Sequence, residues 1–274
     1  MEKKLKTEDE LELMMYIDQI ADAQAIVIII HGMGEHAGRY AELTEKLNGA
    51  GYSVLAFDHR GHGRSSGKRG HSPSYEHLMK DLEMVINESV QLFPGLPAFL
   101  FSQSMGANLA LNYTIRKQDS RVKGIIASSP YLRLAFDPPK WKVSLGRMAS
   151  GIYPGFSQST GLEVAAISRI TEVVEKYKKD PLVHDKITAS FFVNVHKAGA
   201  YAIQKAHEIK IPVLVMHGEA DRLTSAEASR QLVEHSGDHV KGFFFPDGYH
   251  ELHNDLDADS AYFKMIGWIK STLI

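Results

Sequence analysis

The sequence of 274 residues contains no cysteine, which excludes disulfide bonds, thiolate metal sites and a cysteine nucleophile. Long apolar runs are also missing. The longest, at residues 25–30, is too short to span a bilayer, and the first residues lack the apolar stretch of a secretion signal. Neither sign of charge dominates, since 31 Lys and Arg are scattered among 33 Asp and Glu. We therefore expect a cytoplasmic protein, at most peripheral to a membrane, with no nucleic-acid partner.

Continuous apolar runs alternate with helical patterns along most of the chain. The runs cover residues 25–30, 53–57, 98–101, 122–127 and 212–216, and such runs are typical of strands buried on both faces. A further strand is predicted at the run 240–245. The helical patterns cover residues 40–50, 75–93, 105–118, 226–235 and 260–273. This alternation predicts an α/β fold, with a mostly parallel, doubly wound sheet and helices on both faces. Two polar-apolar alternations, at 3–7 and 10–17, predict an edge hairpin before it.

One interval breaks the alternation. Between residues 131 and 209 no buried-strand run occurs, and aromatic and proline clusters precede a helical stretch at 167–179. An excursion of this length between two core strands predicts a separate subdomain above the carboxyl edge of the sheet. We therefore expect a core of residues 1–130 and 210–274, with residues 131–209 inserted as a cap, or lid.

A serine lies on the predicted turn between the run at 98–101 and the helix at 105–118. The sequence S-Q-S-M-G places Ser104 between the small residues Ser102 and Gly106, close to the pattern G-x-S-x-G of a nucleophile elbow. Ser102 departs from that pattern, but its side chain is nearly as small as that of glycine. A serine before a helix is more often only an N-cap, so the rest of the chain must decide.

A serine nucleophile needs a base to take its proton and an acid to orient the base. Asp221 follows the run at 212–216, and His250 follows the run at 240–245. The order Ser104, Asp221, His250 is the one expected for an α/β-hydrolase arrangement, and these are the catalytic residues that we predict. The alternatives are Asp247 and Glu251 for the acid, and His217 and His253 for the base.

Two backbone amides are expected to stabilise the oxyanion of such a reaction. Met105 follows the nucleophile at a helix N-terminus, and Met33 lies in the H-G-M-G loop after residues 25–30, where glycines let the backbone approach a substrate. The residues from His250 to His253 do not have the H-E-x-x-H spacing of a zinc site. We expect neither a metal nor a cofactor.

The glycines after the first buried run allow a different interpretation. The sequence G-M-G-E-H-A at 32–37, followed by a helix and by Asp58, nearly reproduces a dinucleotide-binding fingerprint, which would indicate an NAD-dependent oxidoreductase. Against it, Glu35 places a carboxylate where a pyrophosphate would bind. A non-catalytic binding module is a third interpretation, and the complete set of nucleophile, acid and base argues against it.

Four segments of the chain resemble the monoacylglycerol lipase and lysophospholipase branch of the α/β-hydrolases. They read H-G-M-G-E-H-A-G-R-Y at 31–40, F-D-H-R-G-H-G-R-S-S-G at 57–67, S-Q-S-M-G-A-N at 102–108, and H-G-E-A-D at 217–221 with Y-H-E-L-H-N at 249–254. The resemblance extends through nearly the whole chain. Ser102, Gln103 and Ala107 depart from it, since the family usually has glycine, histidine and glycine there.

The resemblance implies hydrolysis of monoacylglycerols to fatty acid and glycerol through an acyl-enzyme. It also implies an active site of Ser104, Asp221 and His250, with the amides of Met33 and Met105 as the oxyanion hole. The family's polar pocket for the glycerol head group would fall on Glu35, Arg39 and His253. A lysophospholipase or a general carboxylesterase would use the same machinery with another head group.

Large apolar residues gather at 132–156, within the predicted cap. Those that face inward would form a tunnel for an acyl chain, and burial of each methylene contributes about 0.8 kcal/mol. Those that face outward would contact a membrane or a micelle. A lipid ester is therefore the expected partner, and the sequence leaves the oligomeric state open.

Overall fold

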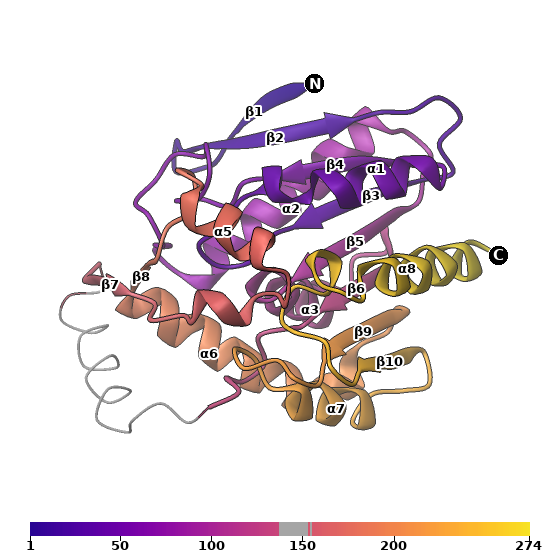
Figure 1. Ribbon diagram of the computed structural model, residues 1–274. Helices are drawn as coiled ribbons and strands as arrows, with labels where there is room; N and C mark the ends of the chain where they lie inside the picture. Colours follow the sequence, from indigo (N-terminus) through magenta and orange to yellow (C-terminus); the bar gives the residue numbers. More distant parts are fainter. Residues whose placement is uncertain (137–152, 154) are drawn as a thin grey trace.

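The computed structural model describes residues 1–136, 153 and 155–274, and an eight-stranded sheet crosses it in the order β1-β2-β4-β3-β5-β6-β9-β10 (Figure 1). The strands are β1 (Glu2–Lys6), β2 (Glu12–Asp18), β3 (Ala25–Ile30), β4 (Tyr52–Phe57), β5 (Ala98–Gln103), β6 (Val122–Ser128), β9 (Val213–Gly218) and β10 (Val240–Phe245). Strands β1 and β2 form an antiparallel hairpin, β2 pairs antiparallel with β4, and all other pairs are parallel. The predicted α/β fold is confirmed, including its mostly parallel sheet.

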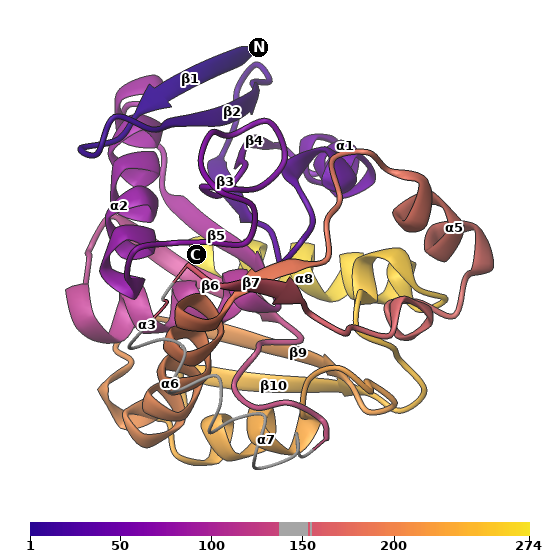
Figure 2. The same ribbon diagram turned by 90° about the vertical axis from the view of Figure 1, so that its left-hand side faces the viewer.

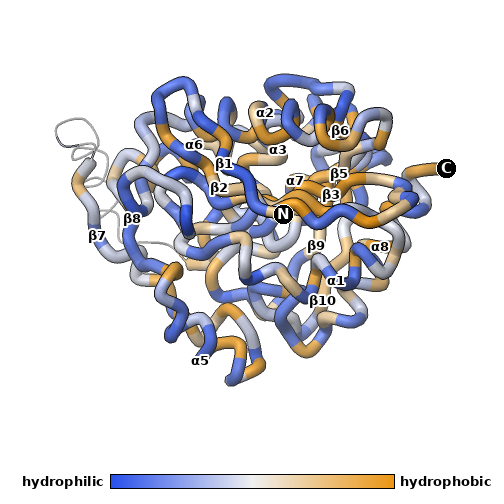
Figure 3. The backbone as a smooth tube through the Cα atoms, turned by 90° about the horizontal axis from the view of Figure 1, so that it is seen from above, coloured by the Kyte–Doolittle hydropathy of each residue, from blue (hydrophilic) through white to orange (hydrophobic). Residues whose placement is uncertain are grey.

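Helices cover both faces of this sheet (Figures 1 and 2). Helices α1 (Ala41–Gly49) and α8 (Ala258–Leu273) pack on one face, and α2 (Tyr75–Leu92), α3 (Met105–Lys117) and α7 (Ala226–Glu234) pack on the other. In β3, residues Ile26, Ile28 and Ile30 belong to one core cluster, while Ala25, Val27 and Ile29 belong to the other. Successive strand residues point to opposite faces, so a strand that is buried twice must be apolar throughout. Figure 3 shows this apolar centre along β3 and β5.

In its described residues, the segment between β6 and β9 supplies a second, two-stranded sheet and the helices α5 and α6. Its elements are β7 (Ser157–Ser159), α5 (Thr171–Lys179), β8 (Lys186–Thr188) and α6 (Ala189–Gln204), and β7 pairs antiparallel with β8. Short 3-10 helices are η1 (Ala37–Tyr40), η2 (Val164–Ala166), η3 (Ala206–Glu208) and η4 (Leu252–Asn254). Within the described residues, no helix combines the length and the apolar character needed to cross a membrane.

Helix α6 joins this segment to the helical layer of the core. The side-chain amide of Asn108, on α3, donates a hydrogen bond to the carbonyl of Val195 at 3.1 Å. One turn later, the amide of Asn112 donates to the carbonyl of Ala198 at 3.0 Å. Residues four apart lie on the same face of a helix, so both amides reach the α6 backbone. Helix α6 therefore packs on α3, although it lies within residues 131–209.

Helix α5 begins at Thr171, four residues later than the sequence pattern predicts. The residues before it are bonded to the loop that follows η4. The hydroxyl of Ser168 donates to the carbonyl of Asn254 at 2.7 Å, and the guanidinium of Arg169 donates to the carboxylate of Asp255 at 2.9 Å. These long-range contacts keep the residues before Thr171 out of the helix that apolar spacing alone indicates.

The turn from β5 into α3 has a backbone conformation that is rare for a residue with a side chain. Ser104 has a φ of 53°. Gly106 follows it where α3 passes the end of β3, and a Cβ atom on Gly106 would lie 2.2 Å from the carbonyl oxygen of Ile30. Ser102 fits in place of the expected glycine, because its hydroxyl donates to the carbonyl of Ile126 at 2.9 Å. Thus only the second glycine of the elbow pattern is sterically required here.

Substitution Gly106→Ala tests this close approach. We expect it to lower the free energy of unfolding by about 3 kcal/mol, because backbone carbonyls cannot move aside for the added methyl group. Chemical denaturation monitored by circular dichroism measures the change. Gly49→Ala, at the end of α1, is the matched control, since no atom lies within 4 Å of its added Cβ. Equal stability of the two variants would contradict this account of the turn.

Candidate active site

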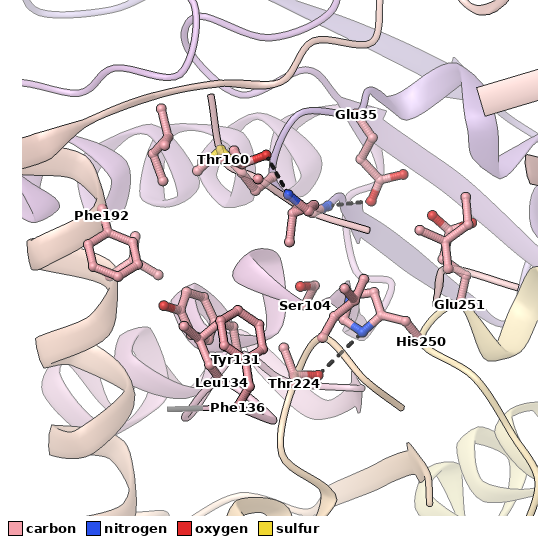
Figure 4. Close-up of a pocket in the computed structure, with 18 of the residues that line it drawn as sticks. Glu35, Ser104, Tyr131, Leu134, Phe136, Thr160, Phe192, Thr224, His250 and Glu251 are labelled. Carbon is pink, nitrogen blue, oxygen red and sulfur yellow. Dashed lines mark hydrogen bonds between the residues drawn. The ribbon is translucent and has the colours of Figure 1, made fainter. Parts of the chain in front are cut away.

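A cavity of about 280 Å³ opens over Ser104 (Figure 4). Loops at the carboxyl ends of the parallel strands form one side of it, through Met33, Ser104 and His250 among others. Residues between β6 and β9 form the other side. Because parallel strands end at the same edge of a sheet, loops that are distant in sequence meet there. The pocket thus lies where the sequence places its candidate residues.

Asp221 and His250 form a buried pair at this edge. Oδ2 of Asp221 lies 2.7 Å from Nδ1 of His250. The same carboxylate accepts hydrogen bonds from the hydroxyl of Thr224 at 2.7 Å and from the backbone amide of Leu223 at 2.7 Å. Nε2 of His217 lies 3.1 Å from Oδ2 on the buried side. Burial by itself raises the pKa of Asp221, but the two histidines and these hydrogen bonds hold it well below its usual value.

The His250 ring reaches the pocket from this pair. Figure 4 shows it beside Ser104, and both residues line the cavity. Burial lowers the pKa of His250, but the charge of Asp221 and its hydrogen bond outweigh burial, so the net pKa is raised. The structure therefore brings together Ser104, Asp221 and His250 from three separate loops.

Each of these alternative acids and bases is exposed, bonded to another group or buried away from the pocket. Asp247 is exposed, and Glu251 accepts hydrogen bonds from both terminal nitrogens of Arg39 at 2.7 Å. His217 is completely buried behind Asp221 and is not among the described residues that line the pocket. Neither alternative acid contacts His250 in the way that Asp221 does.

The loop after β3 is held by buried polar contacts. The amide of Gly32 donates to the carboxylate of Glu35 at 2.7 Å. The amide of His59 donates to Nε2 of His31 at 2.9 Å, so Nδ1 carries the proton and donates to the carbonyl of Gly32 at 2.7 Å. Burial lowers the pKa of His31 to about 3, and only the neutral ring both donates and accepts in this way. These bonds orient the backbone around Met33, which lines the pocket.

The two amides predicted for the oxyanion hole remain available. Among the backbone hydrogen bonds that the described turns and loops make, none has the amide of Met33 or Met105 as its donor. Met105 is the first residue of α3, where helix geometry leaves amides without intrahelical acceptors. Gly32, by contrast, already donates to Glu35, so this loop does not offer a phosphate the glycine amide that a dinucleotide site uses.

Glu35, Arg39 and Glu251 form a buried charged cluster beside the pocket. The Arg39 guanidinium contacts both carboxylates and stacks on the Tyr177 ring, 4.5 Å from its centroid. Burial raises the pKa of Glu35. Burial also acts on Glu251, but the Arg39 charge outweighs it and holds the pKa of Glu251 at about 2. Only the two acids line the cavity, so Arg39 supports them from behind.

His253 does not reach the pocket. Its ring stacks on Tyr40 at 4.8 Å between centroids and is almost completely buried. Burial lowers the pKa of His253 to about 4, so the ring is neutral at pH 7. The Tyr40 hydroxyl in turn donates to Glu35 at 2.7 Å. His253 therefore packs against the residues that hold Glu35, rather than facing a ligand.

Thr224 and Glu251 line the pocket, but the sequence analysis did not predict either of them as a pocket residue. Thr224 lies only three residues after Asp221, and a hydroxyl at this spacing in a turn is a local signal for a bond to the acid. Glu251 was weighed only as an alternative acid. No group of three or more His, Asp or Glu side chains is arranged to hold a metal ion in the described ranges.

The far side of the pocket is apolar. Leu134, Phe136, Ile187, Phe192 and Val195 line it. Other apolar residues of the predicted tunnel, between positions 137 and 152, lie outside the described residues. No Lys or Arg occurs among the described residues that line the cavity, and its polar groups include carboxylates, hydroxyls and the His250 imidazole.

Comparisons with known proteins agree with this geometry. The sequence model of the family described as serine aminopeptidase, S33, matches residues 21–257. A monoacylglycerol lipase from Mycolicibacterium smegmatis is 32% identical over 92% of this chain and 90% of its own length. The crystal structure of Paleococcus ferrophilus monoacylglycerol lipase is 36% identical, with a TM-score of 0.87 over 96% of this chain and 99% of that one.

A further relative, an uncharacterized abhydrolase domain-containing protein from Dictyostelium discoideum, is 34% identical over 91% of this chain. The match covers only 26% of that longer protein. The family match extends from before β3 to beyond His250, and the two lipase matches each cover more than nine tenths of the chain. The chain belongs to the serine aminopeptidase S33 family of α/β-hydrolases, within its monoacylglycerol lipase group.

Proposed function

We propose that the protein is a serine hydrolase that cleaves lipid monoesters. The observation that carries the proposal is the buried contact of 2.7 Å between Asp221 and His250, at a pocket that Ser104 also lines. An imidazole held by a carboxylate at its Nδ1 leaves Nε2 free to accept a proton. The positive φ of Ser104 raises its hydroxyl at the turn between strand and helix, where an ester carbonyl can approach.

The reaction proceeds in two balanced halves. The Ser104 oxygen attacks the ester carbonyl carbon while Nε2 of His250 takes its proton, and Asp221 stabilises the resulting imidazolium. The amides of Met33 and Met105 donate to the oxyanion. The alcohol then leaves with the proton from His250, which gives an acyl-enzyme. A water molecule then attacks this ester in the same way. The fatty acid is released, and the free hydroxyl of Ser104 is regenerated.

The pocket lining favours a neutral head group. Glu35 and Glu251 lie at the polar end, and the described lining residues include no cation that would balance a phosphate. The Glu35 carboxylate has four acceptor positions, and in the described part of the chain three of them accept hydrogen bonds, from Gly32, Arg39 and Tyr40. We infer that the remaining position accepts a glycerol hydroxyl. A monoacylglycerol meets these conditions better than a lysophospholipid, and a simple carboxylic ester remains the second candidate.

The predicted cap would supply the acyl side of the pocket. We propose that residues 131–209 act in this way, because Leu134, Ile187 and Phe192 all come from this segment. Phe136, Tyr153 and Phe156 are exposed by 52%, 73% and 57%. Large apolar side chains left in water are suited to transient contact with a membrane or micelle, from which a lipid substrate would enter.

Substitution Ser104→Ala tests the proposed nucleophile. We expect kcat for a monoacylglycerol to fall by on the order of 10⁶-fold, because the acyl-enzyme cannot form. Release of fatty acid measures the rate, and a fluorophosphonate probe tests covalent labelling. Ser102→Ala, at the neighbouring buried serine, is the matched control and should retain labelling. Labelling of the Ser104→Ala protein would refute the assignment.

Substitution Asp221→Asn tests the electrostatic coupling. We expect it to lower the pKa of His250, because burial remains while the attraction of the carboxylate is lost. The acidic limb of the kcat/KM profile should move to lower pH with it, although kcat falls by on the order of 10⁴-fold. NMR titration of the His250 ring measures the pKa directly. Asp247→Asn, at an exposed acid, should leave it unchanged; an equal shift in both variants contradicts the pairing.

Substrates with one acyl chain and different head groups test the specificity. We expect kcat/KM for a monoacylglycerol to exceed that for a lysophosphatidate by on the order of 100-fold, because a phosphate anion would face two carboxylates that share a single cation, Arg39. Lysophosphatidylcholine and a simple ethyl ester complete the set. Rapid cleavage of the two phospholipids would overturn the head-group assignment and leave the serine mechanism standing.

A further inference from the structure

Gln103 connects the nucleophile's strand to the loop of the proposed base. It is the last residue of β5 and directly precedes Ser104. Its side chain is 1% exposed, and its Nε2 donates a hydrogen bond to the carbonyl oxygen of His250 at 3.0 Å. Gln103 is not among the described residues that line the pocket. Its effect on a reaction would therefore act through its neighbours and not through contact with substrate.

The loop that carries His250 has few other attachments at this point. Tyr249, the residue before, donates its amide to the Asp255 carboxylate at 2.9 Å, and Glu251, the residue after, donates its amide to the carbonyl of Ile167 at 2.8 Å. Among the hydrogen bonds of the described residues, the one from Gln103 is the only one to the main chain of His250. It is also the direct link between that residue and β5.

We infer that Gln103 is a positioning residue for the reaction, and this inference rests on the function proposed for Ser104 and His250. The side-chain amide of Gln103 holds the main chain of His250. Because Gln103 is also the neighbour of Ser104 in the chain, this bond fixes His250 relative to Ser104. Asp221 fixes the other end of the same residue, at the ring. A misplacement of about 1 Å in such a constellation costs on the order of 10²-fold in rate, so a single well-placed donor has a measurable effect.

The chemistry of the contact requires a donor. A carbonyl oxygen accepts only, and the buried Oε1 of Gln103 has no partner among the described residues. A buried acceptor without a partner is unfavourable. An apolar side chain would avoid that cost but would leave the His250 carbonyl unpaired. An ionised carboxylate would repel this carbonyl, whereas a protonated carboxyl group would donate to it again.

Three variants separate positioning from packing. In Gln103→Met, which keeps the volume and removes the donor, we expect kcat to fall by about 10- to 100-fold with little change in KM. In Gln103→Glu, kcat relative to the unmodified protein should rise as pH falls, because protonation of the buried carboxyl restores a donor. Ser102→Ala is the matched control, since Ser102 lies on the same strand and bonds instead to Ile126.

If relative kcat rises as pH falls in Gln103→Glu but not in Gln103→Met, the result supports positioning. A packing defect would give both variants the same pH dependence. The opposite trend, a falling ratio, would mean that the new charge acts only by raising the pKa of His250. That result overturns the inference. So does a kcat for Gln103→Met within about twofold of the unmodified protein, since the donor would then contribute almost nothing.

A measurement without turnover distinguishes this inference from the proposed function. The proton on Nδ1 of His250, hydrogen-bonded to Asp221, gives a downfield NMR resonance that the His250→Asn variant identifies by its absence. We expect this resonance to persist in Ser102→Ala and to broaden or vanish in Gln103→Met. An unchanged resonance in Gln103→Met refutes the role of Gln103, even if no ester is hydrolysed. Absence of hydrolysis by the unmodified protein refutes the proposed function alone.

Discussion

The close passage of α3 beneath the end of β3 is the constraint on which the site depends. It is possible because Gly106 has no Cβ, and it forces the chain to reverse at Ser104 with a φ of 53°. The same passage places the N-terminus of α3 next to the loop that carries Met33. The candidate nucleophile and two candidate donors for an oxyanion are therefore positioned by one packing contact in the backbone, before any side chain of the pocket is considered.

The charges around this turn are largely balanced by one another. Asp221 is bonded to His250, Thr224 and backbone amides, and Arg39 lies between two carboxylates. Groups fixed in this way need not reorganise when a substrate binds. Such preorganised dipoles lower the activation barrier of a reaction most effectively. The arrangement also has a cost, since a buried charge is tolerated only while its partners remain. The polar half of the pocket therefore depends on contacts among the loops that follow β3, β9 and β10.

The sequence predicted the parts of this structure that follow from burial and chain direction. The run at 25–30 indicates a strand because both of its faces are covered, and Asp221 and His250 could be paired because parallel strands end at one edge. The sequence could not predict contacts between residues far apart in the chain, because these contacts depend on the directions in which the side chains point. Arg39 and Glu251 are 212 positions apart, and no periodic pattern in the sequence indicates their hydrogen bonds. His253 lies at the expected end of the chain, yet its ring turns to stack on Tyr40.

The two halves of the pocket follow different physical rules because they come from different segments. The polar half, with Glu35, Thr224 and His250, belongs to loops of the sheet, where a hydrogen bond lost on one partner leaves another group buried and unpaired. The apolar half, with Leu134, Ile187 and Phe192, comes from the segment between β6 and β9, where side chains of similar volume can replace one another at small cost. Side chains of the segment between β6 and β9 can therefore change without disturbing the contact between Asp221 and His250, whereas a change at Glu35 alters the network that also fixes the loop carrying Met33.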